Sequence, residues 1–309
     1  MQEIIEQISK TGNHEKIPPD AFIKIEPKQG DILFVDGGNA ELAGGADFSV
    51  QFIRVAGVIF NGKEKVKTGV SEFYALFYLE REKDKIVVKT KISAVRGNAP
   101  DEKNLVFYFM NQEFSSFADA VRKICEINIA CRMAENEKPD LVVLDGTLET
   151  KTELEKIAIE RLIKISRIRN AGLCALSKTT SMVSFSGESL PFLIGKSAPK
   201  ERFFLPVSDA GNFRTFIAKL HPDSDYLFRC DLLPETSTGI LGEIAFISND
   251  PVFLGYPYGL IEADKIARVS NREKEILRIE MSAKMGKKWL DLEEKERAVN
   301  AHSILDNML

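Results

Sequence analysis

Two aspartates stand at the ends of similar apolar runs. Asp36 lies in the run ILFVDGG and Asp145 lies in the run LVVLDG. Short runs of this kind, rich in β-branched residues, predict buried strands, and here each strand would end in a carboxylate followed by glycine. Two carboxylates that meet at one edge of a sheet repel each other, and a proton or a divalent cation relieves the repulsion. The repeated motif therefore indicates a metal site.

The same motif also has an ordinary explanation. Asp followed by Gly is common in turns, because Asp hydrogen-bonds its own backbone and Gly accepts positive φ. For either segment alone the two explanations carry equal weight. The repetition of the motif, and the order of the elements between and after its two copies, favour the metal site.

A further acid and a lysine are candidates for the same chemistry. Glu126 lies beside the apolar stripe of a predicted helix that runs from residue 115 or 116 to about residue 136. A surface ion pair with Arg122, four residues earlier, is the simpler explanation for this acid. Lys178 follows a predicted strand over 173–176 and is flanked by hydroxyl side chains. Such a lysine suits a phosphate contact as well as it suits a solvated loop.

The segment from about 182 to 222 is rich in Phe, Gly, Ser and Pro and predicts an irregular insertion. Its basic residues are interleaved with aromatic ones, a mixture typical of grooves for single-stranded nucleic acid. An ordinary irregular subdomain would have a similar composition. The candidate nucleic-acid-binding residues of this segment are Lys196, Lys200, Arg202 and Arg214.

The elements around these residues predict an α/β fold. The strand with Asp36 is followed by a loop over 39–45 and an antiparallel meander, then by the helix with Glu126, the strand with Asp145, a second helix and the strand before Lys178. A later helix carries Asp264. This is the order of the ribonuclease-H-like fold, whose mixed sheet, flanked by helices, gathers acids from its first strand, first helix, fourth strand and last helix. The other predicted elements are meander strands over 48–60, 74–79 and 86–92, helices over 153–170 and 261–269, strands over 226–233 and 242–247, and a charged amphipathic section over 272–309.

Four stretches in this order resemble the NurA nucleases, which act in DNA end resection beside the hexameric HerA translocase. They are VDGGNAEL around Asp36, VVLDGTLE around Asp145, LSKTTS around Lys178, and GYPYGLIEADKIARVS over 255–270. The similarity extends from about residue 30 to at least residue 270, which is most of the chain.

The resemblance implies a set of site residues. Asp36, Glu126 and Asp145 would bind the divalent metal, typically Mn²⁺ in this family with Mg²⁺ as the alternative, as a pair of ions. Lys178 and Tyr256 would complete the site.

Some positions of this set depart from the family or have rivals. Asp264 takes the last metal-side position, where the family commonly has His. An acid still offers oxygen ligands, but the change affects the metal preference and any proton-transfer role. Glu113 or Glu135, which flank the same helix, could replace Glu126, and His302 could take the place of Asp264.

The activity implied is that of a metal-dependent DNA nuclease. It would be of the 5′-3′ exonuclease and single-strand endonuclease type and would act on single-stranded DNA and duplex ends in end resection and double-strand break repair. Two cations about 3.5 to 4 Å apart can activate the attacking water and stabilise the leaving alkoxide, and Asp36 would bridge them. Lys178 would stabilise charge on the phosphorane oxygens, and Tyr256 would orient the water or stack on a base. The implied partners are a HerA-type hexameric ATPase and a second copy of the chain in a homodimer.

Two other functions fit part of the sequence. A catalytically silent adaptor of the same fold, docked on a ring ATPase, would account for the departure at Asp264. A sugar kinase or actin-like ATPase also uses Asp-Gly phosphate loops, but the sequence shows neither a duplicated domain nor a second Gly-rich loop for adenosine.

The composition bounds these expectations. The chain has 309 residues, 44% of them hydrophobic, and a formal net charge of −4, which disfavours a protein that coats nucleic acid by bulk electrostatics. Residues 1–29 predict an N-terminal arm and residues 30–309 the nuclease domain.

No apolar run is long enough for a signal peptide or a membrane span, so a cytoplasmic location without membrane contact is expected. The cysteines form no CxxC pair and lie in apolar surroundings, which disfavours a structural zinc and indicates a reducing compartment; they are Cys125, Cys131, Cys174 and Cys230.

Overall fold

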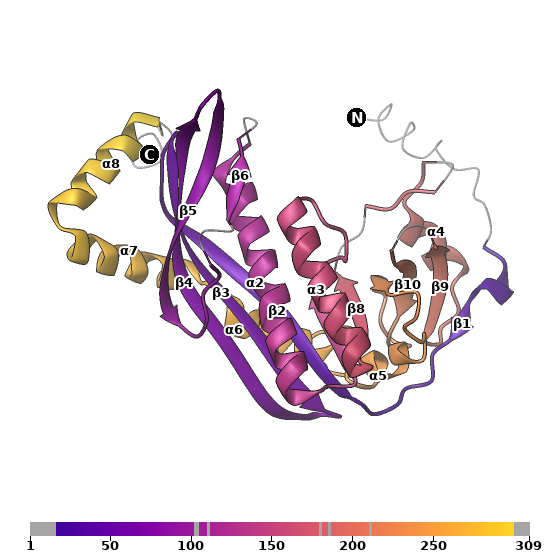
Figure 1. Ribbon diagram of the computed structural model, residues 1–309. Coiled ribbons are helices and arrows are strands. Elements are labelled where there is room, and N and C mark those ends of the chain that lie inside the picture. Colours follow the sequence, from indigo (N-terminus) through magenta and orange to yellow (C-terminus); the bar gives the residue numbers. More distant parts are fainter. Residues whose placement is uncertain are drawn as a thin grey trace.

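A computed structural model gives the fold of the chain (Figure 1). It describes residues 17–101, 105–109, 112–178, 181–184, 187–209 and 212–299. Residues 1–16 of the predicted N-terminal arm lie outside these residues, and so does His302.

One mixed sheet of eleven strands runs through the described residues, in the order β1-β9-β10-β11-β8-β7-β2-β3-β4-β5-β6. Strand β2 lies near its centre, parallel to β7 on one side and antiparallel to β3 on the other. The strands are β1 (Ile23–Lys24), β2 (Asp31–Gly44), β3 (Phe48–Asn61), β4 (Glu64–Glu82), β5 (Lys85–Arg96), β6 (Val106–Tyr108), β7 (Leu141–Asp145), β8 (Gly172–Ser177), β9 (Phe203–Ser208), β10 (Arg214–Lys219) and β11 (Phe228–Leu232).

Helices cover both faces of this sheet (Figure 1). Helices α2 (Phe114–Glu137) and α3 (Glu153–Arg169) pack on one face, while α5 (Ile240–Phe246) and α6 (Tyr258–Ala267) pack on the other. The remaining helices are η1 (Pro19–Ala21), α4 (Leu190–Ser197), which packs on β9 and β10, and α7 (Asn271–Met285) with α8 (Lys287–Val299), which pack on β2, β3 and β4. Successive residues of a strand face opposite sides. Accordingly Leu33 and Val35 of β2 join the core under α2, whereas Ile32 and Phe34 join the core under α6.

The predicted fold class is confirmed. Strands β2, β3 and β4 form the antiparallel meander, helix α2 crosses over, and β7 returns parallel to β2 with β8 beside it. A crossover helix is what a parallel neighbour needs. The four elements that were expected to carry the acids, namely β2, α2, β7 and α6, therefore converge on one region of the sheet.

The predicted end of the first strand at Asp36 is wrong. Strand β2 continues to Gly44, through the expected loop over 39–45, and Gly37 and Gly38 pair with residues of β3. Instead of forming a turn, these glycines leave room for the helices that pack on the two faces of β2. A Cβ on Gly37 would lie 2.4 Å from the Glu126 Oε1 atom on α2, and a Cβ on Gly38 would lie 2.5 Å from the Ala267 carbonyl oxygen at the end of α6. Bare backbone at two successive positions lets a helix approach each face of β2.

Two other predictions of local structure need correction. Residues 242–247 were expected as a strand, but 242–246 lie in helix α5 and Ile247 is its C-cap. A short apolar run does not distinguish a strand from a buried helix. The segment over 182–222 is more regular than expected, since it contains α4, β9 and β10 and extends the sheet. All four cysteines are buried, as their apolar surroundings predicted, and none of them forms a disulfide. Among the helices in the described ranges, none has both the length and the apolar character that crossing a bilayer requires.

Candidate functional site

The register of the parallel strands brings Asp36 and Asp145 together. Val35 of β2 pairs with Leu144 of β7, so the two aspartates follow at matching positions on neighbouring strands. Parallel strands lie about 4.8 Å apart, and residues at matching positions point to the same face. Here that face is the α6 side, because Phe34 and Val143, two residues earlier on each strand, belong to the core under α6.

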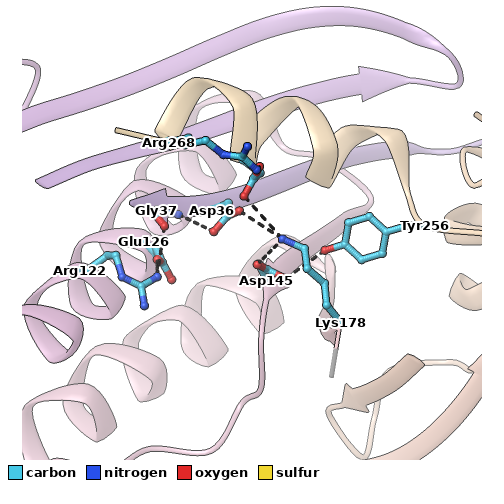
Figure 2. Close-up of polar contacts among 9 residues, drawn as sticks. Asp36, Gly37, Arg122, Glu126, Asp145, Lys178, Tyr256 and Arg268 are labelled. Atoms are coloured by element: carbon cyan, nitrogen blue, oxygen red, sulfur yellow. Dashed lines mark hydrogen bonds and ion pairs between the residues drawn. The ribbon is translucent and has the colours of Figure 1, made fainter. Parts of the chain in front are cut away.

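The Lys178 ammonium lies between three carboxylates (Figure 2). Its Nζ atom is 3.1 Å from Asp145 Oδ2, 3.7 Å from Asp264 Oδ1 and 3.9 Å from Asp36 Oδ2. The three acids come from β7, α6 and β2, and the lysine comes directly after β8. Side chains from four elements thus meet at one position, and the group at the centre of the three carboxylates is the positively charged ammonium of Lys178.

Tyr256 and Arg268 hold two of these carboxylates from the α6 side. The Tyr256 hydroxyl donates to Asp145 Oδ1 at 3.0 Å, and Arg268 Nη2 donates to Asp264 Oδ2 at 2.6 Å. The Tyr256 side chain is buried, and its ring lies 5.4 Å from the Lys178 ammonium. A ring in this place has no free face for a nucleobase, so the expected stacking on a base is wrong. The hydroxyl orients Asp145.

Glu126 reaches the site from α2, on the opposite face of β2. The carboxylate is buried, and its Oε1 atom accepts a hydrogen bond of 2.7 Å from Arg122 Nη1. The ion pair that the spacing predicts is therefore present, but it is not a surface pair. In Figure 2 the pair lies beside Gly37, next to Asp36.

Burial and mutual repulsion disfavour the charges of these acids. Burial, with the charges of Asp145 and Glu126 adding to it, raises the pKa of Asp36 to about 8. Burial likewise raises the pKa of Glu126 to about 7, although Arg122 opposes the shift. For Lys178 burial works against the ammonium, but Asp145 and Asp36 outweigh it and raise its pKa. The site has an excess of negative charge that only partly finds positive partners.

The donor set fits a hard divalent cation. It consists of carboxylate oxygens, the ligands that Mg²⁺ and Mn²⁺ prefer. In the ranges that the structure describes, no three His, Cys, Asp or Glu side chains form a ready-made metal site. The Lys178 ammonium lies between three of these carboxylates, at the position that a divalent cation would take.

A cleft of about 830 Å³ opens beside the acids on the α2 side. Asp36, Glu126 and Asp145 line it, and so do residues at the N-terminal ends of α2 and α3. Helix N-termini carry partial positive charge and suit phosphate groups. Three basic side chains also line the cleft, namely Arg122, Lys123 and Lys151. A volume of this size is in the range of small-molecule and nucleotide sites.

The other predicted residues lie elsewhere. Arg202 donates to the Leu220 carbonyl and to Asn249, and Arg214 donates to the Thr236 carbonyl. Lys196 lies 4.3 Å from the Phe192 ring, and the Lys200 carbonyl accepts a bond from Lys219. All four belong to the region of α4, β9 and β10, whereas the acids meet at β2 and β7. Their role in binding nucleic acid stays a prediction.

Several residues of the site were not singled out from the sequence. The loop after Asp145 is held by Lys123, which donates to the carbonyls of Thr147 and Glu149, and by Asp231, whose Oδ2 accepts from the Leu148 amide at 3.2 Å. Arg268 stands four residues after Asp264, a spacing that could have indicated it. Nothing in the sequence links Asp231 to this loop.

The comparisons with known proteins concern the fold. No protein-family model and no curated protein matches the sequence. The NurA nuclease from Sulfolobus solfataricus has a TM-score of 0.64 over 93% of this chain and 94% of that chain, at 13% identity. The catalytic domain of human endonuclease V has a TM-score of 0.42 over 91% and 97%, at 10% identity, and a structure of NurA with manganese has 0.44 over 88% and 90%, at 8% identity. The first similarity shows that the chain has the fold of a NurA nuclease, as the resemblance implied.

Proposed function

We propose that a chain with this fold and this group of carboxylates is a divalent-metal-dependent deoxyribonuclease that hydrolyses phosphodiester bonds. One observation carries the proposal: three aspartates from β2, β7 and α6 surround a single cationic group, with Glu126 close behind. Carboxylates so crowded are expected where a more highly charged cation binds. The cofactor proposed is Mn²⁺ or Mg²⁺, as two ions held by Asp36, Glu126, Asp145 and Asp264.

The residues of the chain have separable tasks in this reaction. When bound, the cations would supply an activated water and neutralise charge at the phosphate. Asp36, whose charge couples to those of both Asp145 and Glu126, would be the ligand that the two cations share. Tyr256 keeps Asp145 oriented through its hydrogen bond. With cations bound in its place, Lys178 would be free to stabilise charge on the phosphoryl oxygens.

The substrate and partners follow from the family resemblance. We propose DNA single strands and duplex ends as substrate, in end resection and double-strand break repair, with 5′-3′ exonuclease and single-strand endonuclease activity. A HerA-type hexameric ATPase would feed the DNA, which suits a chain whose net charge is negative. A homodimer and a cytoplasmic location belong to the same proposal.

The test uses end-labelled linear DNA, single-stranded and duplex, with Mn²⁺ or with a chelator. We expect cleavage with Mn²⁺ and none with the chelator. Asp36→Ala and Asp145→Ala should each abolish cleavage while the far-UV circular dichroism spectrum stays unchanged. Asp47→Ala is the matched control, because its side chain is 56% exposed and pairs with Lys295 on α8.

Two results would overturn parts of the proposal. Manganese-dependent cleavage that persists in either aspartate variant removes that residue from the site. A wild-type chain that folds, binds a HerA-type ATPase and cleaves no DNA under any metal condition would be the silent adaptor instead.

A further inference from the structure

Gly37 connects the two candidate ligands that approach from opposite faces of β2. Its amide donates to Asp36 Oδ1 at 2.7 Å, and its carbonyl accepts from Arg122 Nη1 at 3.3 Å. The same Nη1 atom donates to Glu126 Oε1 at 2.7 Å. Figure 2 shows the resulting chain of contacts from Asp36 through Gly37 and Arg122 to Glu126.

We propose that Arg122 is a positioning residue of the metal centre: its guanidinium fixes the Glu126 carboxylate to the backbone of β2 beside Asp36, so that both can bind the same divalent cation. The inference rests on the proposed function. Residues that orient a ligand through a hydrogen bond are a regular part of metal sites, and their loss costs about 10- to 100-fold in metal affinity.

The packing around Gly37 fixes the position of the Arg122–Glu126 ion pair against β2. A Cβ at residue 37 would lie 2.4 Å from Glu126 Oε1 and 2.9 Å from Arg122 Cγ. The pair therefore rests directly on bare backbone, and a Cβ at this position would push the Glu126 carboxylate aside. This assigns a task to the first glycine of the Asp-Gly-Gly motif, which the strand itself does not require.

Ordinary helix stabilisation does not account for the pair. The arginine precedes the glutamate by four residues, and this orientation does less for a helix than the reverse one. The Glu126 side chain is 7% exposed and that of Arg122 is 27% exposed, so both groups lose most of their hydration. A buried pair of this kind adds little net stability to a fold. The guanidinium also lines the cleft beside the acids, which places it at the site rather than on an outer surface.

The test measures Mn²⁺ binding to the full chain without DNA, by calorimetry and by the electron paramagnetic resonance signal of free Mn²⁺. Arg122→Met should raise the Mn²⁺ dissociation constant about 10- to 100-fold, and Arg122→Lys should have an intermediate effect because lysine offers charge without the planar fork. Excess Mn²⁺ should restore much of the cleavage lost in Arg122→Met. Arg132→Met is the control, since Arg132 lies on the same helix and donates to Ser71 Oγ; it should leave the dissociation constant unchanged.

Gly37→Ala provides a second route to the same displacement and should also weaken Mn²⁺ binding. If Arg122→Met does not fold, the Mn²⁺ dissociation constants of Gly37→Ala and Arg122→Lys test the inference. A folded Arg122→Met or Arg122→Lys variant with wild-type Mn²⁺ affinity would overturn the inference and leave the nuclease proposal standing. A wild-type chain that binds no Mn²⁺ would overturn both.

Discussion

At the scale of single residues, the fold keeps Asp36 in a position that is unfavourable for an isolated carboxylate. The side chain is 7% exposed and lies next to Asp145 on the neighbouring strand. Its charge is also repelled by that of Glu126, which approaches from the other face of β2. Buried charge that is only partly paired is costly, and a protein retains it where the charge is used. The loss of folding stability caused by this buried carboxylate should therefore be measurable when no divalent cation is present.

Withholding metal should make wild-type stability fall with pH. A folded-state pKa of about 8 for Asp36 lies above the unfolded value near 4, so the folded chain holds a proton that the unfolded chain releases. The associated stability is complete below pH 4 and is lost as the pH rises toward 8, by a few kcal/mol at about 1.4 kcal/mol per pKa unit. Asp36→Asn should lose less stability over this pH range and should melt at a higher temperature than wild type at pH 9 in chelator. Melting temperatures that change by the same amount in the two proteins between pH 5 and pH 9 would contradict this.

Lys178 should have opposite effects on binding and on catalysis. Its ammonium and a divalent cation compete for the same carboxylates, and like charges a few ångströms apart repel. Lys178→Met should therefore tighten Mn²⁺ binding severalfold in calorimetry while it lowers kcat about 10²- to 10³-fold, the usual cost of losing one group that stabilises transition-state charge. Lys164→Met on the exposed face of α3 serves as the control. Weaker Mn²⁺ binding in Lys178→Met would show that the lysine supports the site instead of competing for it.

At the scale of elements, the loop after Asp145 is fixed from two sides. Lys123 of α2 donates to two of its carbonyls, and Asp231 of β11 accepts from its Leu148 amide. Asp231 is fully buried and also accepts hydrogen bonds of 2.9 Å from Thr215 and from Arg229. The end of β7 is thereby tied to both its neighbouring helix and a strand two positions away in the sheet.

Removing the Asp231 carboxylate should be strongly destabilising. Asp231→Ala leaves the Leu148 amide and the Thr215 hydroxyl without an acceptor and part of the Arg229 charge uncompensated. Breaking a buried pair in this way costs on the order of 3 to 5 kcal/mol, which urea unfolding can measure. Asp223→Ala, whose side chain is 82% exposed, should change the unfolding free energy by less than about 0.5 kcal/mol. Equal effects of the two substitutions would show that the network does not stabilise the loop.

The elements also show what the sequence could and could not predict. The repeated apolar run with Asp-Gly was enough to place Asp36 and Asp145 side by side, because parallel pairing of two such strands fixes their register. Strand length was not predictable, since glycines in a strand interior look the same as glycines in a turn. The spacing of Arg122 and Glu126 indicated an ion pair, but its burial depends on the tertiary contact with the bare backbone of Gly37. Contacts such as Asp231 to Leu148 arise from tertiary structure alone.

At the scale of the whole molecule, the described helices differ in how firmly they are attached. Helix α6 buries Leu260 and Ala263 in the core under the sheet, whereas α7 has no buried residue. The C-terminal pair α7 and α8 lies at the outer side of β3 and β4 (Figure 1) and is held mainly by Trp289, with partly buried side chains around it. Ion pairs contribute too, among them Arg54 with Glu273 and Arg278 with Glu296. Of the four acids of the site, Asp264 lies on α6 and none lies on this outer pair.

This difference predicts that α7 and α8 detach before the sheet unfolds. Trp289 is the one tryptophan of the sequence and is 3% exposed, so its fluorescence reports the docking of α8. In urea we expect the shift of tryptophan emission to have a lower midpoint than the loss of far-UV circular dichroism, because elements with few buried apolar contacts open at lower free energy. Glu296→Gln, which weakens the bonds to Arg278 at 2.8 and 3.3 Å, should lower the emission midpoint and leave the dichroism midpoint in place. Coincident transitions in both proteins would mean that the two helices unfold together with the sheet as one cooperative unit.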